Sequence, residues 1–74
     1  MKIDYDTQAE AMYIQLREGE IEDTLEVNPH VFVDVDASGE PLGIEILFSQ
    51  RTLQQLDLAS ITVNIAAAPL TAAA

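Results

Sequence analysis

VFVDVDASGEPLGIEI, residues 31–46, alternates apolar and polar side chains on both sides of a glycine-containing turn. Branched aliphatic side chains recur at every second position of both arms: Val31, Val33, Val35, Leu42, Ile44 and Ile46. Period-two alternation is typical of a strand that buries one face. The stretch therefore predicts a β-hairpin whose aliphatic side chains lie on one side and whose carboxylates lie mainly on the other.

The pairing register of this hairpin follows from keeping all the aliphatic side chains together. With Asp36 opposite Pro41, three cross-strand pairs form: Val35 with Leu42, Val33 with Ile44 and Val31 with Ile46. A slip of one residue would turn half of these side chains to water. Residues 37–40 are left for the turn, with Ser38-Gly39 at its tip, where glycine accepts a positive φ.

Three further segments alternate in the same way. Residues 2–6 and 11–17 predict strands joined in a hairpin at Asp6-Thr7, a pair suited to turn hydrogen bonds. Residues 21–27 predict an exposed or edge-like strand, because charge on its outer face discourages pairing between sheets. Asn28-Pro29-His30 separates this strand from the central hairpin.

The C-terminal third has a different character. Ser49 is suited to cap a short helix that runs to about Leu56, with Leu53 and Leu56 spaced to sit on the sheet. Residues 60–65 alternate like another strand and contain no acid, and an alanine-rich end follows. We expect residues 1–57 to form the domain and residues 58–74 an apolar extension. The extension is either an oligomerisation strand or, after residue 65, a floppy end.

The complete prediction is an α+β fold. An antiparallel meander of about five strands carries one short helix packed on its apolar face, and a C-terminal strand is added to its own sheet or to a neighbour's. A chain of 74 residues has room for one domain and buries only about 60 to 65% of its unfolded surface. Since it contains no cysteine to form a disulfide, we expect a homo-oligomer.

Charge restricts the possible partners. The chain has 13 acidic residues against 3 Lys and Arg, a formal charge of −10. Nucleic acid and anionic membranes would be repelled. The N-terminus lacks the apolar core of a signal peptide, and no stretch reaches the roughly 20 apolar residues of a membrane span. We expect a cytoplasmic, soluble protein that binds neither nucleic acid nor membranes.

Several motifs together are similar to a small bacterial family, the domain of unknown function 2283. They are Tyr5-Asp6, Ala9-Glu10-Ala11-Met12-Tyr13-Ile14, Val33-Asp34-Val35-Asp36, Gly39 and Leu42-Gly43-Ile44-Glu45-Ile46-Leu47. The resemblance covers residues 2 to about 53, with Glu10 where the family usually has Asp. The family has no established activity. Some members are similar to the smaller partners of toxin-like proteins in bacterial gene pairs, so the resemblance implies an antitoxin-like role.

Asp34, Asp36, Ser38, Gly39 and Glu45 reproduce the spacing of a calcium-binding loop, with Ser in place of the third acid. A calcium loop, however, coils between two helices, whereas alternating apolar residues flank this one. In an extended arm, Asp34 and Asp36 lie about 6.8 Å apart along the strand and do not surround an ion. A solvated turn, a weak surface cation site and a structural calcium site remain the alternatives.

Other candidate residues indicate little chemistry. Carboxylate pairs such as Asp34 with Glu45, or Asp4 with Asp6, lack the enclosed pocket that acid–base catalysis needs. His30 is the only histidine and has no partner for a triad or a metal site nearby in sequence, so we expect a loop histidine. Tyr5 and Tyr13 belong either to sheet packing or, for Tyr13, to an interface.

We therefore expect a non-enzymatic interaction module without a cofactor, whose acidic face binds a basic protein partner, which the family resemblance implies is toxin-like. The alternative is a weak divalent-cation-binding protein that uses Asp34, Asp36, Ser38 and Glu45.

Overall fold

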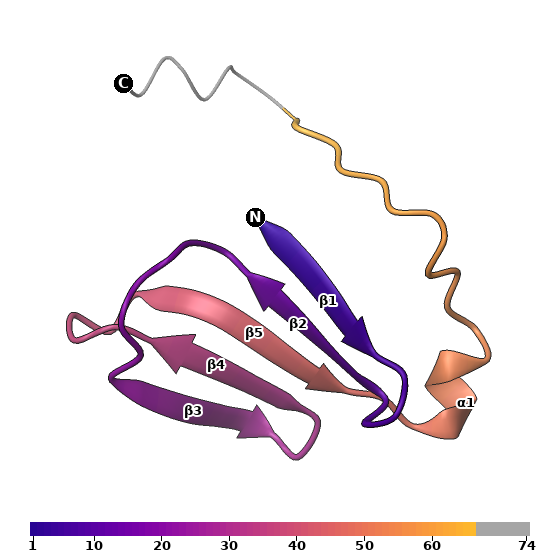
Figure 1. Cartoon of the computed structure of the whole chain (residues 1–74), viewed down its shortest axis with the longest axis horizontal. Helices are drawn as coiled ribbons and strands as arrows, with labels where there is room; N and C mark the ends of the chain where they lie inside the picture. Colours follow the sequence, from indigo (N-terminus) through magenta and orange to yellow (C-terminus); the bar gives the residue numbers. More distant parts are fainter. Residues whose placement is uncertain (67–74) are drawn as a thin grey trace.

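A computed structural model describes residues 1–66 of the chain as a five-stranded antiparallel sheet followed by one short helix. The elements are β1 (Lys2–Asp6), β2 (Ala11–Gln15), β3 (Asp23–Asn28), β4 (Val31–Val35), β5 (Pro41–Leu47) and α1 (Gln50–Leu53). The sheet forms a single layer with α1 at its side (Figure 1). This agrees with the predicted α+β class, although the protein is mostly β.

The central hairpin is the antiparallel pair β4–β5, as predicted. Val31 pairs with Ile46 and Val33 with Ile44, in the expected register. Val35, however, lies opposite Pro41 instead of Leu42, because a bulge shifts the register between Asp34 and Val35. The prediction that Asp36 faces Pro41 is therefore wrong by one residue at the turn end of the hairpin.

The turn explains this shift. The Asp36 amide donates to the Glu40 carbonyl, and the Gly39 amide donates to the Asp36 carbonyl. Gly39 has a φ of 86°, the left-handed conformation that glycine adopts without a Cβ clash. Pro41 has no N–H to donate, so a regular pair of hydrogen bonds cannot form where β5 begins.

The β1–β2 hairpin also forms as predicted, through the side chain of Asp6. Its Oδ1 atom accepts hydrogen bonds from the amides of Gln8 and Ala9, at 2.9 and 3.0 Å. Glu10 completes the turn with a φ of 54°. Aspartate is more common than glutamate in this left-handed region.

The strand order is β1-β2-β5-β4-β3, so the predicted simple meander is wrong. β1 and β2 are neighbours in space as in sequence, and so are β3, β4 and β5, but β2 lies beside β5 instead of β3. The chain leaves β2, passes β5 and β4, and enters the sheet again at its far edge as β3 (Figure 1). The expectation that residues 21–27 form an edge strand is confirmed for β3.

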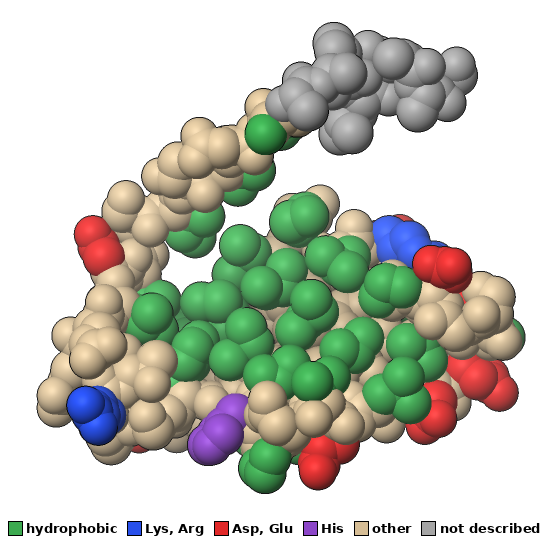
Figure 2. Space-filling model, turned by 180° about the vertical axis from the view of Figure 1, so that it is seen from behind, with side chains coloured by type: hydrophobic (Ala, Val, Ile, Leu, Met, Phe, Trp, Pro, Cys, Tyr) green, Lys and Arg blue, Asp and Glu red, His purple; other side chains and the backbone are tan. Residues whose placement is uncertain are grey.

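The two faces of the sheet differ sharply in character. One face, here called the apolar face, consists of two rows across the strands: Ile3, Ile14, Ile44, Val33 and Leu25, then Tyr5, Met12, Ile46 and Val31. Figure 2 shows these apolar side chains gathered over the sheet. The opposite, acidic face presents Asp4, Asp6, Glu26, Asp34 and Glu45.

Within residues 1–66 the buried hydrophobic core is very small. Its buried hydrophobic side chains are Ala11, Val35 and Leu42, at 9, 6 and 2% exposure. Leu25 on the apolar face is 48% exposed, and Ile3 is 37% exposed. A sheet normally packs its apolar face against a second layer, and the described part of this chain supplies no such layer.

The helix forms where it was predicted but does not cover the sheet. The Ser49 side chain accepts a hydrogen bond from the Thr52 amide, which confirms the predicted cap. Regular helix ends at Leu53, and 3₁₀-type hydrogen bonds continue only to Leu56. Since α1 lies beyond the end of β5, the apolar face stays open (Figures 1 and 2), and the prediction that the helix packs on it is wrong.

Residues 58–66 extend away from α1 without joining the sheet (Figure 1). The strand predicted at residues 60–65 is absent from this part of the structure, where Ile61, Val63 and Ile65 are 62, 77 and 72% exposed. The rest of the predicted extension, residues 67–74, lies outside the described residues. In the part of the chain that is described, no helix has the length and apolarity needed to cross a membrane.

Candidate protein-interaction surface

A hydrogen-bonded chain of side chains crosses the acidic face. The Tyr13 hydroxyl of β2 donates to Asp34 Oδ2 of β4 at 2.7 Å. The Thr24 hydroxyl of β3 donates to Asp34 Oδ1 at 2.6 Å. Both oxygens of this carboxylate thus have protein donors, and three strands are joined through it.

Gly43 of β5 makes the Tyr13–Asp34 contact possible. It lies directly between β2 and β4 in the sheet, opposite Asp34, and the Tyr13 ring passes over it. A Cβ atom at this position would lie 2.1 Å from the Tyr13 hydroxyl oxygen. Glycine within a strand often marks such a close approach, and this was the one sequence signal that could have revealed the contact.

The same contact changes the acidity of the tyrosine. The hydrogen bond to Asp34, together with burial and the negative charges of Asp34 and Glu45, raises the pKa of Tyr13 to about 12. A phenolate here would lose its hydrogen bond and face two carboxylates. Tyr13 therefore stays a hydrogen-bond donor throughout the physiological pH range.

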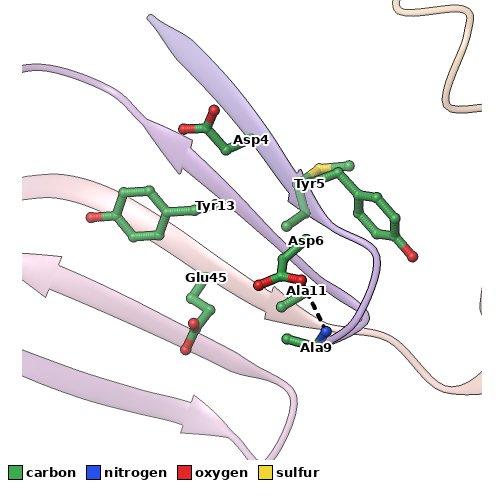
Figure 3. Close-up of a pocket in the computed structure, with 8 residues that line it drawn as sticks. Asp4, Tyr5, Asp6, Ala9, Ala11, Tyr13 and Glu45 are labelled. Atoms are coloured by element: carbon green, nitrogen blue, oxygen red, sulfur yellow. Dashed lines mark hydrogen bonds between the residues drawn. The ribbon is translucent and has the colours of Figure 1, made fainter.

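An open cavity of about 320 Å³ lies beside this tyrosine on the acidic face. Its lining includes Asp4, Asp6, Glu45 and the Tyr13 ring, with Ala11 beside Asp6 (Figure 3). Asp4 pairs with Tyr13 across β1–β2, and Tyr13 pairs with Glu45 across β2–β5. The strand register thus brings together carboxylates that are 41 positions apart in the sequence.

The turn with calcium-loop spacing is held together by its own hydrogen bonds. Asp36 Oδ1 accepts from the Ser38 amide and hydroxyl and from the Glu40 amide. Asp36 Oδ2 forms an ion pair with Arg17, in the connection after β2. The Ser38 hydroxyl and the Arg17 guanidinium hold the pKa of the Asp36 carboxyl well below its usual range.

The residues proposed for a cation site have separate roles in the structure. Asp34 bridges Tyr13 and Thr24, Asp36 closes the turn, and Glu45 lies opposite Phe32 at the acidic cavity. Within residues 1–66, no group of three or more His, Cys, Asp or Glu side chains is placed to hold a metal ion. The structure therefore joins Ser38 to Asp36 within the turn but does not bring Asp34, Asp36 and Glu45 together as one site.

His30 lies in the turn between β3 and β4, where the sequence suggested a loop histidine. Its amide donates to Asn28 Oδ1 at 2.7 Å, and its carbonyl accepts from the Leu47 amide. It also lines a second cavity, of about 240 Å³, with Phe48 and Thr52. These backbone contacts join the β3–β4 turn to the end of β5.

Comparison with known proteins adds a family but no function. No curated protein matches the chain, and no solved structure matches it either. A family model described as "Protein of unknown function (DUF2283)" matches residues 2–49, which include all five strands. The chain belongs to this family.

Proposed function

We propose that the protein is a small acidic interaction module that binds a basic protein partner through the cavity on its acidic face. The observation that carries this proposal is the cavity lined by Asp4, Asp6, Glu45 and the Tyr13 ring. A guanidinium pairs with carboxylates in a two-pronged geometry and stacks on tyrosine. An arginine side chain of a partner is therefore the group that suits this cavity best.

The overall charge supports the same kind of partner. A formal charge of −10 on 74 residues attracts a basic protein over a long range and speeds the encounter. The cavity would then select a side chain that is both cationic and planar. A small, basic, toxin-like protein is the partner that the family resemblance favours, with this chain in the antitoxin-like role.

The test is an NMR titration of the full chain with a short blocked peptide, Gly-Arg-Gly, against the same peptide with neutral citrulline in place of arginine. We expect amide shift changes to concentrate in β1, β2 and β5 around the cavity. The citrulline peptide should leave these signals unchanged, because it keeps the shape of arginine but lacks its charge.

A matched pair of variants separates site binding from general attraction. Glu45→Gln removes one charge at the cavity, and Glu20→Gln removes one charge in the exposed connection before β3. We expect Glu45→Gln to weaken arginine-peptide binding at least fivefold and Glu20→Gln to change it less than twofold. Equal effects of the two variants would contradict a specific cavity.

A further inference from the structure

We propose that the apolar face of the sheet is the interface of a face-to-face homodimer, a β-sandwich built from two identical single-layer sheets. The inference goes beyond the acidic-face function and does not depend on it, because it concerns the opposite side of the sheet. Two sheets that pack in this way lie about 10 Å apart, with their inner side chains interdigitated.

The first reason is that the face is built like one half of a sandwich core. The row of Ile3, Ile14, Ile44, Val33 and Leu25 places one branched aliphatic side chain on every strand of the sheet. The side chains at the middle of this row are only half-buried. A second sheet would bury them as the interior of a two-layer protein does.

The second reason is the distribution of charge. Charged side chains lie around the apolar patch rather than within it (Figure 2). A basic partner would find no carboxylate to pair with at the centre of this face, whereas a second copy offers the same uncharged surface. A two-fold axis makes such a patch complementary to itself. It also directs the acidic faces of both copies outward, so that two chains of charge −10 meet on their least charged sides.

The third reason is size. Five strands about 4.8 Å apart, each contributing about five residues at about 3.3 Å per residue, cover roughly 400 Å² in projection. Side-chain relief makes the accessible area larger than its projection, so two copies bury on the order of 1,000 Å² or more, which reaches the range of specific interfaces. We expect a dissociation constant on the order of micromolar.

Sedimentation equilibrium of the full chain, at concentrations above and below this value, measures the assembly directly. The wild type should weigh twice its chain mass of 8.1 kDa at the higher concentrations. Ile3→Lys and Leu25→Lys place a cation on the apolar face at the two opposite edge strands, where 37 and 48% exposure allows the monomer to keep its fold. Each should weaken dimerisation at least tenfold, although each lowers the negative charge of the chain.

Val63→Lys is the matched control. It makes the same charge change at a side chain that is 77% exposed in the segment after α1, and it should leave the dimer unchanged. Far-ultraviolet circular dichroism verifies that each variant is folded, and the two face variants test opposite edges independently.

A monomeric wild type would overturn the proposal, and so would an assembly larger than a dimer. Loss of the dimer in Val63→Lys alone would overturn it as well and would place the interface on residues 58–66. These measurements need no peptide, so they test the dimer independently of the acidic cavity. The dimer proposal can be contradicted while arginine-peptide binding is observed, and the reverse also holds.

Discussion

Gly43 determines how three strands of the acidic face are connected. Because it has no side chain, the Tyr13 ring can lie over β5 and reach Asp34. Gly43→Ala would force the ring away and break this hydrogen bond to a charged acceptor. We expect a loss of about 1 to 3 kcal/mol in the free energy of unfolding, measured by urea denaturation.

A second background gives the control for this prediction. In a Tyr13→Ala chain no ring lies over β5, so Gly43→Ala should cost little there or even stabilise the strand by reducing the freedom of the unfolded chain. The loss of unfolding free energy caused by Gly43→Ala should differ between the wild-type and Tyr13→Ala chains only if the Tyr13 ring is the obstacle. Equal costs in both backgrounds would mean that Gly43 is needed for another reason.

The raised pKa of Tyr13 predicts a dependence of stability on alkaline pH. The unfolded chain ionises this tyrosine near pH 10, whereas in the folded protein its pKa is about 12. The folded state thus holds the proton more tightly. The resulting stabilisation is complete below pH 10 and is lost as the pH rises from 10 to 12.

Tyr5→Phe leaves Tyr13 as the only tyrosine of the chain. Ultraviolet titration of tyrosinate in this variant measures the pKa of Tyr13. Asp34→Asn should move it downward, because the charged acceptor that holds the proton is gone. The Tyr13→Phe chain should lose less stability than the wild type between pH 10 and 12. The same alkaline loss in both chains would assign the effect to other groups.

At the scale of secondary structure, local patterns predicted what local contacts determine. Period-two alternation identified the β4–β5 hairpin, and Asp6 and Ser49 were correctly assigned to a turn and a cap. The register failed only at Val35, where the bulge is set by the closing of the turn before Pro41. The alternation within each arm does not show which residue of the other arm lies opposite. A bulge at the turn end of the hairpin leaves both alternating patterns unchanged, so the sequence pattern does not reveal it.

The strand order could not be predicted in the same way. Alternation shows that β2 has an apolar side but does not show which strand lies beside it. The pairing of β2 with β5 depends on contacts distant in sequence, among them the Tyr13–Asp34 hydrogen bond across 21 positions. The acidic cavity was missed for the same reason, since Asp4 and Glu45 meet only after this pairing forms.

Leu42 is one of the residues that hold the connection between β2 and β3 to the sheet. It is 2% exposed, and its carbonyl accepts hydrogen bonds from the amides of Leu16 and Arg17. A Cβ atom on Gly19 would lie 2.7 Å from its side chain, so the connection packs closely upon it. Leu42→Ala should destabilise the protein by about 2 to 4 kcal/mol.

Urea denaturation checks this value, with Leu58→Ala as the control. Leu58 is 42% exposed and lies after α1, so its truncation should cost less than about 0.5 kcal/mol. Similar costs for the two variants would mean that the connection is not anchored at Leu42.

At the scale of the whole molecule, the length of α1 decides how the sheet is completed. A helix that continued to Leu56 over the sheet could have shielded part of the apolar face, as the sequence suggested. Regular helix ends at Leu53, beyond the sheet, and only three hydrophobic residues in the described chain are buried. The amphipathic sheet therefore has one apolar side, for which we propose a second copy as the partner, and one acidic side, for which we propose a basic partner.

These two sides should respond to salt in opposite directions. The proposed dimer would bring together two chains of formal charge −10, so ions that screen their repulsion should strengthen it. Arginine-peptide binding depends on attraction at the acidic cavity, so the same ions weaken it. Between 0.01 and 0.5 M NaCl, where the Debye length falls from about 30 Å to a few ångströms, we expect the dimer to tighten severalfold and the peptide affinity to fall at least tenfold.

Sedimentation equilibrium and the NMR titration, made on one preparation, measure both responses together. Leu25→Lys should dimerise at least tenfold more weakly than the wild type at every salt concentration and should still lose peptide affinity as salt rises, because its acidic face is intact. If dimerisation and peptide binding weakened together, one surface would serve both interactions. Opposite responses require two physically separate faces, which a single-layer sheet with its apolar rows on one side and its carboxylates on the other provides.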